Sequence, residues 1–254
     1  MKYVESSFIT SNKLTLALVD KRITLKMENK LKDKNIRLIK TTYCKNTYDA
    51  IKYHPDISVC KLDNNNIVVA PNVYEYYKDI LSCHNFNVLK GYSDIQYKYP
   101  FNIHYNVAIL GKYAVHNFKY TDKNILEYIE KNNIQKINVK QGYSKCSICI
   151  LDENSIITSD EGIYNECIKY DIDCLLIRKG HIDLFDMNYG FIGGCSGLIS
   201  NNEIAFYGDI IKHPDYEKIL NFVSSKNKKI ISLSDEYLLD LGSIIPLKEV
   251  YTII

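Results

Sequence analysis

Short apolar runs and polar clusters alternate along this chain in an order that repeats. Each repeat opens with an apolar run typical of a buried strand, turns on a few polar residues, and continues into a second apolar run. A stretch with apolar residues at helical spacing follows, ends at a cluster of Asn, Asp or Lys, and leads into a third apolar run. The five opening runs are Leu14–Val19, Ile57–Leu62, Tyr105–Leu110, Cys146–Leu151 and Cys195–Ile199. This order predicts a ββαβ unit that occurs five times.

One such unit cannot cover both faces of its own sheet, so the copies must pack against one another. We therefore predict a single α/β domain over residues 1–254, an α/β propeller with five-fold pseudosymmetry. In its first copy, the pattern predicts a hairpin of strands at Leu14–Val19 and Ile23–Leu25. The alternative is an ordinary α/β protein whose strands and helices merely alternate, which the constant order of segments disfavours. The predicted copies span roughly residues 6–53, 54–99, 100–143, 144–190 and 191–247.

Composition narrows the class of protein. The chain has 254 residues, 46% of them hydrophobic and 24% charged, with a formal net charge of +2. These values are ordinary for a globular protein and lack the basic footprint of a nucleic-acid binder. Residues 1–19 contain no continuous apolar core of a secretory signal, and no apolar run approaches the length of a membrane span. We expect a cytoplasmic protein without nucleic-acid or membrane partners.

The eight cysteines are expected to be reduced in that compartment. Cys146 and Cys149 have CxxC spacing, but no second pair of Cys or His follows at the spacing of a zinc site. No glycine-rich phosphate-binding motif follows any predicted strand either. The sequence therefore predicts neither a metal nor a cofactor.

Five ββαβ units about a pseudo-fivefold axis resemble the pentein fold of the guanidino-group-modifying enzymes, which include arginine deiminase, agmatine deiminase and dimethylarginine dimethylaminohydrolase. At residue level the resemblance is concentrated between Ser155 and Gly194. Ser155–Glu161 looks like the second strand of an agmatine deiminase module. Gly180–Asp183 is similar to the Gly-His-x-Asp segment of those enzymes, and an aromatic strand, Tyr189–Ile192, follows it as theirs does. The chain also resembles an uncharacterised bacterial family with this predicted fold.

The resemblance implies roles for two residues. His181 would be the general acid/base, and Asp183 would bind the guanidinium group of a substrate. The chemistry is reasonable, because His titrates near neutral pH and a carboxylate complements a planar cation with two hydrogen bonds. The alternative is a surface turn with a solvated His.

Residues at the entrances of other predicted strands are candidates for substrate binding. His54 and Asp56 precede the first strand of the second unit, where related enzymes carry an Asp that contacts substrate, and Asn106 has a comparable place in the third unit. Pro55 and Asp56 could instead simply form a turn. Lys145 precedes the fourth unit's first strand, and a Lys in a central channel would favour a carboxylate or phosphate group, whereas a loop Lys would be solvated.

The chain departs from the family pattern at the position of the nucleophile. Those enzymes carry a Cys after the last module, but Asp240–Leu247 has none, and Ser243 would need a base to activate it. Strand alternation puts Cys146 on an apolar face with its neighbouring isoleucines, which predicts a core thiol. Cys195 lies among glycines that let a ligand approach the backbone, so it is the better nucleophile candidate. The alternative interpretation is that Cys195 is simply a small buried residue in a crowded strand.

Two function hypotheses remain open. The first is an enzyme that hydrolyses C–N bonds of a guanidino or amino-acid-like substrate bound in a central channel. It would survive if His181, Asp183, Asp56 and Cys195 line one pocket, and scattered positions would end it. The second is a catalytically silent ring that binds a small molecule or a protein. Strands near both termini could close the ring within one chain or pair with another chain to form an oligomer.

Overall fold

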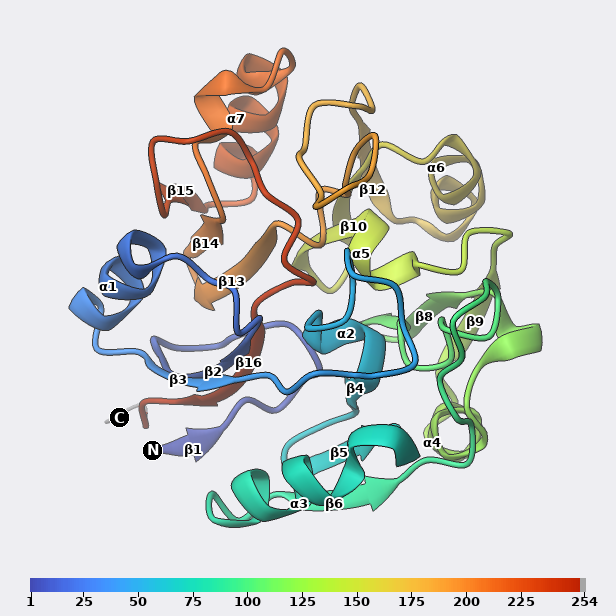
Figure 1. The fold of residues 1–254 in the computed structure, drawn as a ribbon. Helices are drawn as coiled ribbons and strands as arrows, with labels where there is room; N and C mark the ends of the chain where they lie inside the picture. Colours follow the sequence, from blue (N-terminus) through green and yellow to red (C-terminus); the bar gives the residue numbers. More distant parts are fainter. Residues whose placement is uncertain (252–254) are drawn as a thin grey trace.

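The computed structural model describes residues 1–251 and contains five small sheets arranged around a common centre, with the longer helices outside (Figure 1). In four of the sheets the first strand is antiparallel to the second, and the second is parallel to the third. The parallel pair is joined by a helix, as a crossover of this kind requires. These sheets are β4 (Val59–Lys61), β5 (Asn66–Val69) and β6 (Asn87–Lys90); β7 (Ala108–Leu110), β8 (Tyr113–His116) and β9 (Gln135–Asn138); β10 (Ile148–Asp152), β11 (Ser155–Thr158) and β12 (Asp173–Leu176); and β13 (Ser196–Ser200), β14 (Glu203–Phe206) and β15 (Lys229–Ser232). The predicted five-fold α/β propeller of ββαβ repeats is confirmed.

The crossover helices pack an apolar stripe against their sheets. They are α1 (Leu25–Asp33), α3 (Tyr74–Ser82), α4 (Lys123–Lys131), α6 (Glu161–Cys167) and α7 (Tyr216–Ser225), and short 3₁₀ turns flank four of them at η1 (Pro71–Val73), η2 (Phe118–Tyr120), η3 (Ile168–Tyr170) and η4 (Ile210–Lys212). In α4, Ile125 and Ile129 are fully buried on one face. Within residues 1–251, no helix has the length and apolar character needed to span a bilayer.

The first sheet differs from the prediction. Its strand order is β1 (Lys2–Tyr3), β16 (Ile245–Glu249), β2 (Leu14–Val19) and β3 (Arg37–Lys40). The C-terminal β16 pairs antiparallel with β2, so the last strand of the chain supplies the first strand of the first unit and closes the ring within one chain. The predicted strand at Ile23–Leu25 is wrong, because the Thr24 side chain accepts a hydrogen bond from the Met27 amide and caps α1 instead.

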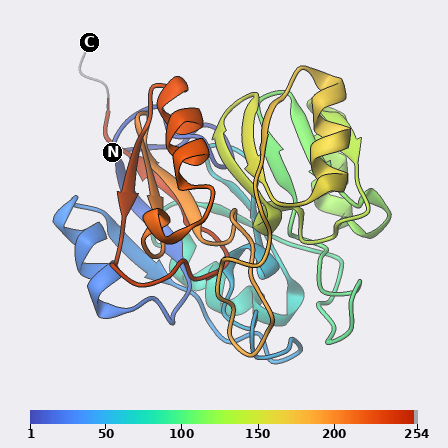
Figure 2. The ribbon, with the colours of Figure 1, turned by 90° about the horizontal axis from the view of Figure 1, so that it is seen from above.

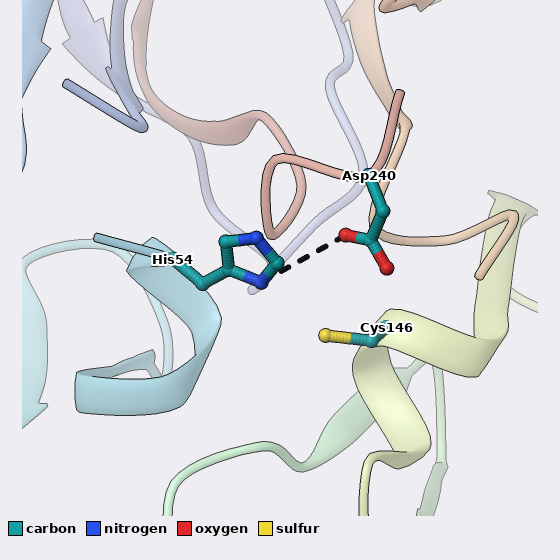
Figure 3. A group of neighbouring side chains, drawn as sticks. All are labelled: His54, Cys146 and Asp240. Atoms are coloured by element: carbon teal, nitrogen blue, oxygen red, sulfur yellow. Dashed lines mark ion pairs between the residues drawn. The ribbon is translucent and has the colours of Figure 1, made fainter. Parts of the chain in front are cut away.

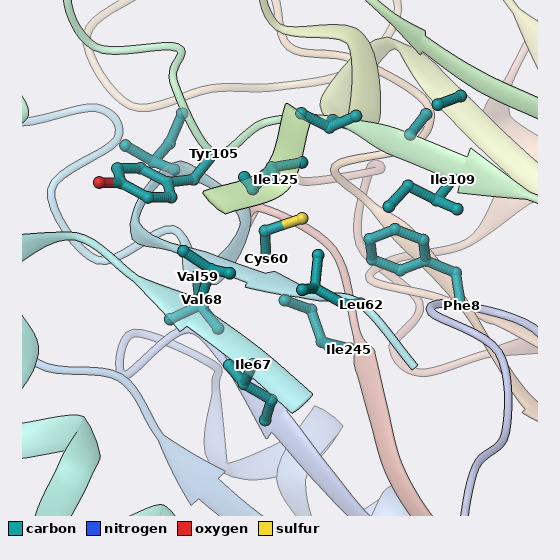
Figure 4. Close-up of a cluster of buried hydrophobic side chains, with 14 of the residues drawn as sticks. Phe8, Val59, Cys60, Leu62, Ile67, Val68, Tyr105, Ile109, Ile125 and Ile245 are labelled. Atoms are coloured by element: carbon teal, nitrogen blue, oxygen red, sulfur yellow. The ribbon is translucent and has the colours of Figure 1, made fainter. Parts of the chain in front are cut away.

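Packing between units forms the core. Figure 4 shows side chains from the first three units and the N-terminal segment meeting around Cys60, with Phe8, Ile125 and Ile245 brought together from distant parts of the sequence. The first two strands of each of these four sheets are buried on both faces, which explains why their sequences are continuous apolar runs rather than alternating ones, whereas the third strands are more exposed.

Two one-turn helices lie near the centre of the ring, α2 (Pro55–Ser58) before β4 and α5 (Ser144–Ser147) before β10 (Figure 1). Longer loops gather on one side of the ring when it is seen from above (Figure 2), where the segments near Tyr48 and Met187 line a shared hollow.

Candidate functional site

The centre of the ring is built by residues that precede the first strand of their sheets. Equivalent strand entrances converge there, so polar side chains meet across long stretches of sequence, 187 positions in the case of one hydrogen bond. All of these side chains are buried. They are Asp56 before β4, Asn106 before β7, Cys146 before β10 and Ser243 before β16.

A hydrogen-bonded network joins the four residues. The Cys146 thiol donates to the Asp56 carboxylate, with Sγ 3.2 Å from Oδ1 and 3.1 Å from Oδ2. Asn106 donates from Nδ2 to Cys146 Sγ at 3.2 Å and accepts from the Cys146 amide at 3.1 Å. Ser243 Oγ donates to Asp56 Oδ2 at 2.6 Å. The thiol is therefore held in place from two sides.

Lys145 lies beneath this network and is 3% exposed. Its Nζ donates to Ser243 Oγ at 2.9 Å and to the Gly193 carbonyl oxygen at 3.4 Å. Burial raises the pKa of Asp56, and the positive charge of Lys145 opposes that rise. The lysine is thus an internal partner of the Asp56 network.

The side chains of His54, Cys146 and Asp240 point toward one another (Figure 3), and Cys146 connects them to this network. His54 precedes α2, and its Nδ1 lies 3.8 Å from Asp240 Oδ1. One nitrogen, sulfur or carboxylate oxygen from each of the three residues lies within 4.8 Å of the others. The Asp240 carboxylate accepts from the amides of Phe191 at 2.9 Å and Gly242 at 3.0 Å, whereas neither ring nitrogen of His54 has a hydrogen-bond partner within residues 1–251.

Burial favours the uncharged forms of all three groups. It raises the pKa of Asp240 to about 7, with a further contribution from the nearby Asp56 charge. It raises the pKa of the Cys146 thiol well above its usual value, and Asp56 and Asp240 add to that rise. Burial and then the Arg22 charge hold the pKa of His54 well below its usual value. Because a cation bound here would stabilise the carboxylates and the thiolate, the site is electrostatically suited to a positively charged ligand.

A pocket of about 290 Å³ opens above these three residues. His54, Cys146 and Asp240 form its floor, and its walls are mostly aromatic and aliphatic. The hydroxyls of Tyr48 and Tyr143 are 2.9 Å apart, and Tyr143 also donates to Asn102 at 2.9 Å, so these two rings are fixed. The wall residues are Tyr48, Ile51, Tyr143, Leu184, Met187, Asn188, Tyr189 and Phe191.

Four of the residues predicted from the sequence meet at this centre, although their roles stay predictions. His54 lines the pocket floor, and Asp56 and Asn106 contact the thiol beneath it. Lys145 is buried beneath them and bonded to Ser243, so it is neither a solvated loop residue nor a free cation in the channel.

The other three predicted residues lie elsewhere. Cys195 is fully buried in the core, and its thiol donates to the Ile192 carbonyl oxygen. His181 is exposed and lines a separate hollow with Arg178, beside the ring of His213. Asp183 is also exposed, and it meets Asp240 through backbone atoms only. The expectation that His181, Asp183, Asp56 and Cys195 line one pocket is wrong, which ends the enzyme hypothesis in that form.

A profile of a family of unknown function (DUF6873) matches residues 18–245. The chain belongs to this family. No curated protein matches the DUF6873 chain in sequence.

Solved structures with the same fold are enzymes of the pentein superfamily. One is SxtG, an amidinotransferase from Microseira wollei in the saxitoxin biosynthetic pathway, with a TM-score of 0.61, 12% identity and 98% of each chain covered. Another is an agmatine deiminase from C. jejuni, with a TM-score of 0.57, 11% identity and 98% of each chain covered. A dimethylarginine dimethylaminohydrolase matches with a TM-score of 0.52 and 9% identity, over 87% of this chain and 92% of the other. The DUF6873 chain therefore has the pentein fold, as its repeat order implied.

Sequence reasoning missed Cys146 and Asp240 in this DUF6873 chain. The prediction treated Cys146 as a strand residue on an apolar face, but it lies in α5, and the strand starts only at Ile148. Strand alternation does not apply in a helical turn, so the thiol points to the centre instead of into the sheet. Asp240 had no signal beyond its place in the segment where the related enzymes carry their Cys.

The same three residues form a set of metal-binding types. An imidazole, a thiolate and a carboxylate are ligands that zinc accepts in proteins, and here they lie within 4.8 Å of one another. The arrangement can thus serve either a metal ion or thiol chemistry on a cation, and the aromatic walls and second carboxylate beneath the thiol favour the latter.

Proposed function

We propose that this DUF6873 protein is a thiol-dependent enzyme that breaks a C–N bond in a small molecule with a planar guanidine-type cation. The observation that carries the proposal is the convergence of a thiol, an imidazole and a carboxylate in the lining of one pocket, with a second carboxylate hydrogen-bonded to the thiol. Cys146 is the attacking group, His54 the acid/base, and Asp240 the carboxylate that faces the bound cation. Asp56 lies beneath the thiol and stabilises the positive charge from below.

The charges of the site support a cationic substrate. Asp240 and Asp56 are buried near each other with raised pKa values, which a cation placed between them would lower again. The same cation would lower the pKa of the Cys146 thiol, so binding of the substrate would itself promote formation of the thiolate. The aromatic rings of the walls are suitable neighbours for a planar cation.

The reaction follows nucleophilic catalysis with a covalent intermediate. Cys146 transfers its proton to His54, and the sulfur forms a bond to the central carbon of the guanidine group. The C–N bond to the departing amine then breaks, and that amine takes the proton from His54. Water adds to the covalent adduct, the C–S bond breaks, and a urea-type product and the thiol are released.

The test compares two single cysteine variants. Cys146→Ser should abolish release of the urea-type product from simple alkylguanidines, and a covalent adduct detectable by mass spectrometry in the wild type should be lost. Cys195→Ser is the matched control, because Cys195 is equally buried but bonded only to a backbone carbonyl in the core. Turnover that survives Cys146→Ser would overturn the proposed role of this thiol.

A catalytically silent ring that binds the same cation is the second candidate function. The raised pKa of Cys146 and the lowered pKa of His54 favour it, because neither group is ionised in the ligand-free site. Calorimetric binding of an alkylguanidine without any turnover would select this function over the enzyme.

A further inference from the structure

The pocket above Cys146 has no positively charged side chain in its lining. Among residues 1–251, the groups above its floor are aromatic, aliphatic or neutral polar, and the polar ones are tyrosine hydroxyls and the Asn188 amide. A carboxylate held between these walls would therefore lose part of its hydration without gaining an ionic partner. Leaving a buried charge unpaired is strongly unfavourable.

Two cationic side chains near the site, Lys145 and Arg22, are already bonded to other groups of the protein. Lys145 lies beneath the floor and donates to Ser243 and to backbone oxygens. Arg22 forms a two-point contact with the carboxylate of Asp20, with Nε–Oδ1 at 3.0 Å and Nη2–Oδ2 at 2.6 Å. Its guanidinium also lies over the ring of Phe185, 4.5 Å from the centroid. Neither side chain is available to neutralise an anionic ligand in the pocket.

The two hollows that adjoin the pocket add negative charge. One shares Tyr48 and Met187 with it and is lined by Asp186 and by Asp49, whose carboxylate lies 3.0 Å from Lys52 Nζ. The other shares Tyr189 and Phe191 and contains Asp160 and Glu161, against which Lys179 is the only lysine or arginine of its lining. A negative group at the far end of a longer ligand would meet Asp186 on one side, and two acidic residues against one lysine on the other.

We infer that the substrate carries no carboxylate: it is a guanidine on an apolar stem whose far end is neutral or positively charged. This inference rests on the proposed function and narrows it, because it excludes the amino-acid-like substrates that the sequence left open. The stem would lie between the aromatic walls, and the guanidine group would face Asp240.

Four compounds with the same guanidine head test the inference: n-butylguanidine, 4-guanidinobutylamine, 4-guanidinobutyrate and arginine. Both kcat/KM for turnover and Kd by calorimetry are measured with wild-type protein. The two compounds without a carboxylate should have a kcat/KM at least about tenfold higher, and a Kd at least about tenfold lower, than the two that carry one. Equal use, or a preference for arginine or 4-guanidinobutyrate, would overturn the inference.

A charge introduced into the wall gives a second measure. Asn188 is exposed and lines the pocket, so Asn188→Lys adds a cation without disturbing the core. Asn188→Lys should lower the ratio of kcat/KM for n-butylguanidine to kcat/KM for 4-guanidinobutyrate about tenfold. Asn188→Gln, the uncharged control, should leave this ratio unchanged. An unaltered preference in Asn188→Lys would count against charge as the cause.

The measurements distinguish a failure of the proposed enzymatic activity from a failure of the proposed ligand class. If none of the four compounds is turned over but n-butylguanidine binds more tightly than 4-guanidinobutyrate, the enzymatic activity is contradicted and the ligand class is supported. If turnover is found and the carboxylates are the better substrates, the enzyme stands and the ligand class is overturned. If none of the four binds or reacts, both are overturned.

Discussion

The surroundings of Asp240 change the pKa of its carboxyl group by an amount that can be measured. Its carboxyl group is buried, and burial raises its pKa from 3.8 to about 7. Between these two values the unfolded chain has ionised this group while the folded chain keeps it protonated. The unfolded state therefore binds fewer protons, and the stability of the fold falls as the pH rises from about 4 to about 7.

Asp240→Asn removes this titration while it keeps an acceptor for one of the two backbone amides that contact the carboxylate. Between pH 5 and pH 8, the wild type should lose roughly 2–3 kcal/mol of unfolding free energy relative to the variant. Urea denaturation of both proteins at the two pH values measures this difference. Parallel pH dependence of the two proteins would mean that Asp240 is ionised in the fold throughout.

At the scale of single elements, one backbone feature repeats in every unit. Each crossover helix is followed by an Asn or Asp in the left-handed region, with φ between 52° and 62°. Asn and Asp tolerate this conformation better than other residues with a side chain, and such a residue reverses the chain from the helix into the next strand. The five positions are Asn35, Asn85, Asn133, Asp171 and Asn227.

Asn227, which follows α7, allows a direct test of this feature. Asn227→Ala should lower the unfolding free energy by about 1 kcal/mol, because alanine pays the full steric cost of the left-handed region, and Asn227→Gly should leave it within about 0.5 kcal/mol. Thermal or urea denaturation gives both values. Asn221→Ala, at an exposed position inside the same helix, is the control and should not destabilise the protein. Equal effects of Ala and Gly at position 227 would contradict the explanation.

At the scale of the whole molecule, the ring depends on contacts between the two ends of the chain. β16 pairs with both β1 and β2, and its Glu249 is fully buried. The Glu249 carboxylate accepts hydrogen bonds from the amides of Ser11 and Asn12, both at 2.9 Å, and lies 3.3 Å from Lys2 Nζ. This side chain fastens the N-terminal segment to the closing strand.

Glu249→Ala would remove a fully buried side chain and leave those two amides without their charged acceptor. The expected loss is roughly 2–4 kcal/mol of unfolding free energy, measured by urea denaturation. Glu127→Ala is the control, since Glu127 belongs to an exposed surface pair with Lys123 and should change stability by less than about 0.5 kcal/mol. A loss no larger than that of the control would show that ring closure does not depend on Glu249.

The sequence by itself determined the unit and its repetition. Apolar runs, polar turns and the Asn or Asp after each helix are local features, and local sterics and burial act in the same way in every copy. The start of an apolar run locates the entrance of a strand, and the resemblance to enzymes that carry a substrate-contacting Asp there selected His54, Asp56 and Asn106. Each of these three side chains lies at the central site.

Only the tertiary structure decided which partners meet. The choice between Cys146 and Cys195 depends on the turn that precedes each strand: the Cys146 thiol, in α5, faces Asp56 at the centre, whereas the Cys195 thiol, just before β13, faces the Ile192 carbonyl in the core. The pairing of β16 with β2 and the approach of Asp240 to His54 join residues far apart in the sequence. Such contacts leave no local pattern, because the free energy that forms them comes from closing the whole ring rather than from any one segment.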